Sequence, residues 1–142
     1  MPEPACVVDS HTWAWHVTGE PKRIGRAARR VLEHSATAYI PAICQWEIAM
    51  TIDAGGFHSD RPIAEWLEQA TATPPFALAP LTAEVAAAAV ELGREGFHGD
   101  PADRMIYATA RILDLPLLTA DTSMRAFDRA LPKARGRRVV WD

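Results

Sequence analysis

The amino-acid sequence predicts a three-layer α/β/α fold around a central parallel sheet. Short apolar segments of strand character alternate along the chain with longer segments of helix character. This alternation is typical of parallel sheets that helices cover on both faces. With 142 residues, 49% of them apolar, the chain is long enough for one buried core and too short for two. Because no repeat or linker interrupts the pattern, we expect a single domain over residues 1–142.

Short apolar runs that end abruptly at polar residues or proline predict the strands. The segments are residues 6–8, 38–40, 117–119 and a last strand at 139–141, while 76–81 suits a short strand or an extended connection. Apolar and β-branched residues fill these runs almost without alternation, which indicates strands buried on both faces.

Apolar residues at helical spacing predict the helices. The ranges are 25–34, 42–52, 61–72, 82 to the Gly93–Gly96 region, 100–113 and 124–130, and residues 11–17 suit a loop and a short helix. The start of the helix at 100–113 is the clearest, because Asp100 is a good N-cap and Pro101 fits the first helical position. Asp103 then lies in the first turn, where the helix dipole favours a carboxylate.

Composition argues against a generally basic surface, a cysteine framework, secretion and a membrane span. A net charge of −3 does not suggest a general nucleic-acid-binding surface, although local basic patches matter more than the total. Cys6 and Cys44 both lie in apolar contexts, which favours buried free thiols over a disulfide or metal framework. The sequence has no secretion signal and no apolar run of membrane length. We therefore expect a soluble, cytoplasmic protein that does not associate with a membrane.

Four acidic residues are expected at one edge of the sheet. Asp9 and Asp121 each follow a predicted strand, Glu47 lies early in the helix after the second strand, and Asp103 opens a later helix. Sites in open α/β sheets form at the carboxyl ends of the strands. Crowded carboxylates repel one another, and a divalent cation that prefers oxygen ligands, such as Mg²⁺ or Mn²⁺, relieves the repulsion. Such a cation can activate a water and stabilise charge on a phosphodiester.

Other chemistries fit the residues less well. The histidines show no zinc-like spacing, and no Ser–His–Asp or Cys–His pattern is found. A receiver-like signalling domain would carry paired acids after the first strand, whereas Ser10 follows Asp9. A phosphatase that forms a phospho-aspartate would carry an acid two residues after Asp9, where His11 stands.

The sequence resembles the PIN-domain ribonucleases, and among them the VapC-type toxins of bacterial toxin–antitoxin pairs. Four blocks in the family's order carry the resemblance: Val7–Trp15, Trp46–Ala49, Asp100–Ala110 and Leu117–Asp121. It covers nearly the whole chain. The resemblance implies a PIN-like fold, Mg²⁺- or Mn²⁺-dependent endonucleolytic cleavage of RNA, and an antitoxin protein that blocks the site. A homodimer is also expected.

By match to the family, the catalytic acids are Asp9, Glu47, Asp103 and Asp121. Asp9, Asp103 and Asp121 are then the expected metal ligands, directly or through water, and Glu47 orients a water or a second metal. The sequence leaves open whether Asp100, Ser10 or Arg104 joins the site. Two alternatives also stay open: a PIN-like module that only binds RNA or protein, and a PIN nuclease of RNA processing without a toxin role.

The basic residues give a weaker signal. Relatives often carry a lysine-rich, glycine-containing stretch after the Trp-Glu helix, whereas residues 50–56 here contain no lysine. Six arginines could hold an RNA backbone or form a solvated helix face and a charged tail, and the second interpretation is preferred. They are Arg26, Arg29, Arg30, Arg135, Arg137 and Arg138.

Overall fold

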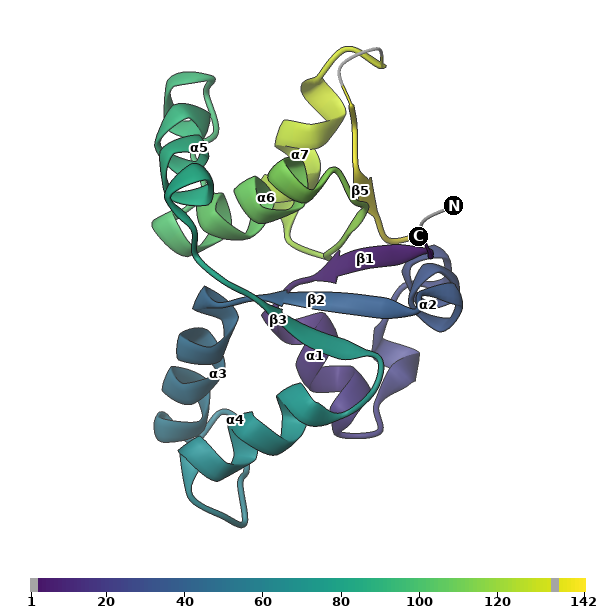
Figure 1. Ribbon diagram of the computed structural model, residues 1–142, viewed down its shortest axis with the longest axis vertical. Coiled ribbons are helices and arrows are strands. Elements are labelled where there is room, and N and C mark those ends of the chain that lie inside the picture. The colour runs from purple at the N-terminus through teal and green to yellow at the C-terminus, as the bar shows by residue number, and fades with distance from the viewer. Residues whose placement is uncertain (1–2, 134–135) are drawn as a thin grey trace.

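A five-stranded parallel sheet in the order β3-β2-β1-β4-β5 forms the centre of the molecule (Figure 1). The computed structural model describes residues 3–133 and 136–142. The strands are β1 (Ala5–Val8), β2 (Thr37–Pro41), β3 (Phe76–Ala79), β4 (Leu117–Leu118) and β5 (Val139–Val140). The parallel sheet confirms the predicted fold class, and residues 76–79, which the sequence left undecided, form a paired strand.

Helices flank the sheet on both sides. They are α1 (Ser10–Val17), α2 (Arg26–His34), α3 (Ile43–Asp53), α4 (Ile63–Ala72), α5 (Ala83–Arg94), α6 (Pro101–Leu113) and α7 (Thr122–Ala130), with a short 3-10 turn, η1 (Pro21–Arg23), after α1. In Figure 1, α1, α3 and α4 lie on one side of the central strands, and α5, α6 and α7 lie on the other. This arrangement is the expected α/β/α architecture.

Three helix starts differ clearly from the prediction. Helix α7 begins at Thr122 and not at Met124, because Asp121 caps it. Helix α1 begins at Ser10, with no loop before it, because Asp9 caps it: Asp9 Oδ1 accepts the backbone N–H of Thr12 at 2.9 Å. Helix α4 begins at Ile63 and not at Arg61. A residue before proline is disfavoured in helical conformation, so Arg61, which precedes Pro62, stays outside the helix.

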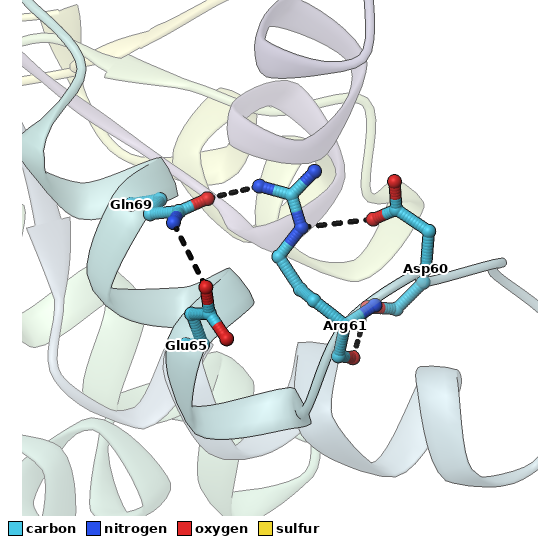
Figure 2. A network of polar contacts seen from close by, with 5 residues as sticks. Asp60, Arg61, Glu65 and Gln69 are labelled. Atoms are coloured by element: carbon cyan, nitrogen blue, oxygen red, sulfur yellow. Dashed lines mark hydrogen bonds and ion pairs between the residues drawn. The ribbon is translucent and has the colours of Figure 1, made fainter.

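Arg61 instead organises a polar network at the start of α4. Figure 2 shows its guanidinium donating to Asp60, at 2.8 Å, and to Gln69. Gln69 in turn donates to Glu65 at 3.3 Å. These side chains are exposed, so the network ties the preceding loop to the helix and adds little to stability.

The hydrophobic core lies around the central strands of the sheet. Cys6, Val7 and Val8 of β1 and both leucines of β4 are fully buried, as are Trp13 and Tyr107. The buried cysteines Cys6 and Cys44 are free thiols, as predicted. Burial raises the pKa of both thiols, which keeps them protonated and unreactive.

One buried acid serves the fold. Asp128 accepts hydrogen bonds from the hydroxyl of Tyr107 at 2.7 Å and from the backbone N–H groups of Arg138 and Val139 at 2.8 and 3.1 Å. It therefore joins α6 and α7 to the edge strand β5. Among residues 3–133 and 136–142, no helix is both long and apolar enough to cross a membrane.

Candidate active site

The parallel pairing of β1 with β4 determines the centre of the site. Val8 lies opposite Leu118, so the next residues, Asp9 and Thr119, emerge side by side at the carboxyl edge of the sheet. Thr119 donates its hydroxyl to Asp9 Oδ2 at 2.5 Å. The other oxygen of Asp9 accepts the N–H of Thr12. Both oxygens of this buried carboxylate are thus held in place.

Asp121 follows two residues after Thr119 and is the N-cap of α7. Its Oδ2 accepts the N–H of Met124 at 2.9 Å and the hydroxyl of Ser123 at 2.5 Å. Its own N–H donates to the hydroxyl oxygen of Thr119 at 3.0 Å. Because Thr119 contacts both acids, the strand end and the helix start hold Asp9 and Asp121 as one unit.

Glu47 reaches the same edge from α3, after the neighbouring strand β2. Ser10, at the start of α1, donates its hydroxyl to Glu47 Oε1 at 2.5 Å. Ser10 is buried and Glu47 is half-buried, so the bond orients the carboxylate. Of the three residues whose part in the site the sequence left open, Ser10 thus donates to Glu47 and lines the same cavity.

Asp103 enters from α6, as the local capping signature predicts. Asp100 Oδ1 accepts the N–H of Asp103 at 2.9 Å, and Pro101 is the first helical residue. A Cβ at Gly99 would lie 2.1 Å from the ring of Phe97 and 3.1 Å from Asp103 Cβ. Only glycine fits this approach, so the loop before α6 packs closely against the residue that it presents to the site.

All four predicted acids line one cavity of about 390 Å³. Asp9, Glu47, Asp103 and Asp121 share its wall with seven other residues, namely Ser10, His11, Trp15, Arg23, Ile106, Ala120 and Met124. Asp9 and Asp121 are the N-caps of α1 and α7, and Glu47 and Asp103 lie within α3 and α6, so the acids come from four helices that are distant in the sequence. The convergence expected from the topology is therefore present.

Burial raises the pKa of three of these acids, and neighbouring carboxylates add to the effect at Asp103 and Glu47. Burial raises the pKa of Asp103 to about 7, and the negative charges of Asp121, Asp100 and Glu47 act in the same direction. Burial also raises the pKa of Glu47, against the hydrogen bond from Ser10. For Asp9, burial again raises the pKa and outweighs the bonds from Thr119 and Thr12. The cavity thus holds more negative charge than its surroundings neutralise.

The donor set suits a hard divalent cation, but the side chains are not already gathered around one. Within the described parts of the chain, no three His, Cys, Asp or Glu side chains form a ready-made metal site. Mg²⁺ keeps several of its waters when few carboxylates bind it. Carboxylates that line a cavity and carry excess negative charge fit contacts of that kind, partly through water.

Two of the basic residues singled out in the sequence have structural roles. Arg104 does not line the cavity, and its Nε donates to the carbonyl of Gly99 at 3.0 Å. Arg138 is largely buried, and one of its nitrogens donates to the carbonyls of Ala110 and Leu115, each at 3.1 Å. Arg135 lies outside the described residues.

Sequence reasoning missed two features of the cavity. Thr119 directly follows the apolar strand β4 and gives no signal of its own, because its role depends on the register between β1 and β4. Arg23 lies in a short turn that carries no motif, yet it is the one lysine or arginine among the lining residues that the structure describes. Both need the tertiary structure to be recognised.

The comparisons with known proteins agree with this fold and cavity. Residues 6–130 match the family described as PIN domain. The chain is 34% identical over 126 residues to Ribonuclease VapC22 of Mycobacterium tuberculosis (strain ATCC 25618 / H37Rv), across 89% of this chain and 94% of that protein. The chain therefore belongs to the PIN-domain family, with VapC-type proteins among its relatives.

Solved structures share the fold at lower sequence identity. A toxin–antitoxin complex from Klebsiella pneumoniae has a chain 20% identical, with a TM-score of 0.62 and coverage of 95% of both chains. VapBC2 from Rickettsia felis, bound to a DNA fragment from its promoter, is 14% identical, with a TM-score of 0.64 and coverage of 97% and 99%. A chain of FitAB bound to a DNA fragment is 24% identical, with a TM-score of 0.53 and coverage of 87% and 90%.

Proposed function

We propose that this protein is a metal-dependent endoribonuclease and the toxin of a toxin–antitoxin pair. The observation that carries the proposal is the convergence of Asp9, Glu47, Asp103 and Asp121 on one cavity in a PIN-domain chain. The relative at 34% identity is named a ribonuclease, and the structural neighbours include toxin–antitoxin complexes. We take residues 1–142 as one PIN domain that acts in the cytoplasm.

In this proposal Asp9, Asp103 and Asp121 hold Mg²⁺ or Mn²⁺. The excess negative charge around Asp103, whose pKa rises to about 7 through burial and neighbouring acids, supports a cation there. Bound in the cavity, the cation would lower the pKa of a coordinated water and offset charge on the phosphodiester.

Residues of the protein position the acids and the attacking water. Thr119 and Ser10 hold Asp9 and Glu47 in place by hydrogen bonds of 2.5 Å each. Glu47 orients the attacking water and accepts a proton from it, and the raised pKa that burial gives this carboxyl makes it a better proton acceptor. The water oxygen bonds to phosphorus while the bond from phosphorus to the leaving ribose oxygen breaks, and that leaving oxygen takes up a proton from solvent water.

Cleavage of RNA by the purified chain tests the enzyme assignment. The wild-type protein, freed of any partner, is incubated with total cellular RNA in Mg²⁺ or Mn²⁺, with EDTA as the metal-free control. Asp9→Asn and Asp121→Asn should abolish cleavage, whereas Asp53→Asn should not, because Asp53 is exposed at the end of α3. Activity that survives in either cavity variant contradicts the assignment.

Growth tests the toxin role separately. Expression of the wild-type chain alone should arrest bacterial growth, and co-expression of a small antitoxin encoded beside it should relieve the arrest. Normal growth with soluble, active protein would favour a PIN nuclease of RNA processing. The homodimer stays a prediction, which light scattering of the purified chain tests.

A further inference from the structure

One positive charge stands in the wall of the acidic cavity. Arg23, in η1, lines the cavity together with the four acids. A divalent cation offsets half of the charge of four carboxylates, so an approaching phosphodiester still meets net repulsion. A guanidinium at the rim would reduce that repulsion, provided that the acids do not occupy its donors.

Arg23 is kept from pairing with those acids. Its guanidinium carbon lies 4.7 Å from the centroid of the Trp15 ring, a cation–π contact. Its one ion pair within residues 3–133 and 136–142 is with Glu20, at 3.8 Å between exposed side chains. Such a pair is weak. The aromatic face therefore positions the guanidinium more than any carboxylate does.

Trp15 is itself held on other sides. Its ring centroid lies 6.2 Å from that of Trp141 and 5.6 Å from that of His11. Trp141 in turn is fixed by the start of α2, where Ala28 donates its N–H to the carbonyl of Trp141 at 3.1 Å. The ring is a built support, because neighbours from α1 and the end of the chain constrain it.

A cation–π contact uses the charge of the guanidinium and does not occupy its five N–H donors with a carboxylate. Those donors can then form the paired hydrogen bonds that suit a phosphate. A carboxylate partner would have consumed them. The contact with Trp15 thus places the guanidinium at the cavity wall, and within the described residues its one carboxylate partner is Glu20, at 3.8 Å.

We propose that Arg23 binds a backbone phosphate of the RNA at the rim of the acidic cavity, and that Trp15 is the positioning residue that holds it there. The inference rests on the proposed function, since it assigns a contact to that substrate. Arg23 is in this view a determinant of substrate binding, and the chemistry at the scissile phosphate stays with the acids.

The test measures binding and turnover for a matched pair of variants. Arg23→Ala removes the cavity charge, and Lys22→Ala removes an equal charge from the adjacent exposed residue of η1. Binding of a short fluorescein-labelled single-stranded RNA of mixed sequence is followed by anisotropy in Mg²⁺, in the Asp9→Asn background that prevents cleavage. Turnover is measured in the wild-type background.

Arg23→Ala should weaken RNA binding about tenfold or more, the value of a charged hydrogen-bonded contact. It should raise KM with little change in kcat, and reduce the slope of log affinity against log salt by about 0.7. Lys22→Ala should change affinity less than about twofold. Arg23→Lys should recover only part of the loss, because lysine keeps the charge without the planar fork.

Trp15 provides a second, independent comparison. Trp15→Leu should weaken binding about threefold, and Trp15→Phe less, because phenylalanine keeps an aromatic face. In the Arg23→Ala background, Trp15→Leu should have no further effect, since its role acts through Arg23. Thermal unfolding checks that each variant is folded.

Equal affinity of the Arg23→Ala and Lys22→Ala variants overturns the inference, whatever the effect of Trp15. If these two variants bind RNA equally well but the wild type still cleaves RNA, only the inference fails and the proposed function stands. If the Asp9→Asn protein does not bind RNA and the wild type does not cleave it, the proposed function is contradicted, and the inference about Arg23 with it.

Discussion

Thr119 donates its hydroxyl to Asp9 Oδ2 at 2.5 Å, although 110 positions of sequence separate the two residues. The same hydroxyl oxygen accepts the backbone N–H of Asp121 at 3.0 Å. One buried side chain therefore joins the ends of two neighbouring strands and spaces two acids of the cavity. Substitution of Thr119 therefore tests how the acids are positioned without changing any acid.

Thr119→Val keeps the shape of the side chain and removes the hydroxyl. We expect stability to fall by about 1–2 kcal/mol, because the buried carboxylate of Asp9 loses a donor. RNA cleavage should fall about tenfold, as is common when a partner of a metal ligand is lost. Thr119→Ser keeps the hydroxyl, is the matched control, and should retain most of the stability and most of the RNA cleavage. Full activity of Thr119→Val would show that the bond does not position Asp9.

The raised pKa of Asp103 predicts that the metal-free protein loses stability as pH rises. Burial and neighbouring acids raise this pKa to about 7, from an ordinary value of 3.8. The folded state therefore binds more protons than the unfolded state between these values, so the free energy of unfolding falls as pH increases across that window. Because Asp103 is half-buried, solvent screening reduces the effect to about 1–2 kcal/mol.

Asp103→Asn removes this titration. Chemical denaturation in EDTA at pH 5 and pH 8 should show a smaller decrease in stability for Asp103→Asn than for the wild type. Asp53→Asn, which changes an exposed acid, should follow the wild type. Parallel pH profiles for wild type and Asp103→Asn would contradict the charge crowding inferred for the cavity.

Divalent cations should restore the stability that the acids cost. At a concentration about 100 times the dissociation constant, Mg²⁺ binding to the folded state adds about 2.7 kcal/mol. Differential scanning calorimetry at pH 8 should thus show a higher Tm for the wild type with MgCl₂ than with NaCl of equal ionic strength. The increase should be much smaller in Asp9→Asn and in Asp103→Asn. An increase of equal size in these variants would place the cation elsewhere.

Asp128 is a buried acid whose role differs from that of the acids in the cavity. Its carboxylate accepts hydrogen bonds from Tyr107, Arg138 and Val139, and it does not line the acidic cavity. Asp128→Ala should therefore destabilise the protein by about 2–4 kcal/mol, because it leaves buried donors unpaired. Tyr107→Phe removes one of these bonds and should cost about 1 kcal/mol. At a temperature where both variants stay folded, cleavage per folded molecule should remain near the wild-type level.

Several local features followed from the sequence because short-range physics decides them. The pair Asp100-Pro101 predicted the start of α6 and the place of Asp103 in its first turn, and the hydrogen bond from Asp103 N–H to Asp100 confirms it. Capping joins residues three positions apart, so neighbouring residues suffice to specify it. The alternation of apolar strands and helices likewise predicted the parallel sheet, and the topology of such sheets predicted that the acids would meet at one edge.

The tertiary structure alone decided how the acids are held and what stands beside them. The roles of Thr119 and Ser10 depend on strand order and register, which join residues far apart in sequence through backbone pairing and not through local preference. Arg23 is an ordinary residue of a short turn until folding brings Trp15 beneath it. Helix caps and amphipathic patterns depend on neighbouring residues, so they can be predicted from the sequence. The partners of each carboxylate depend on packing between distant segments, which only the assembled fold determines.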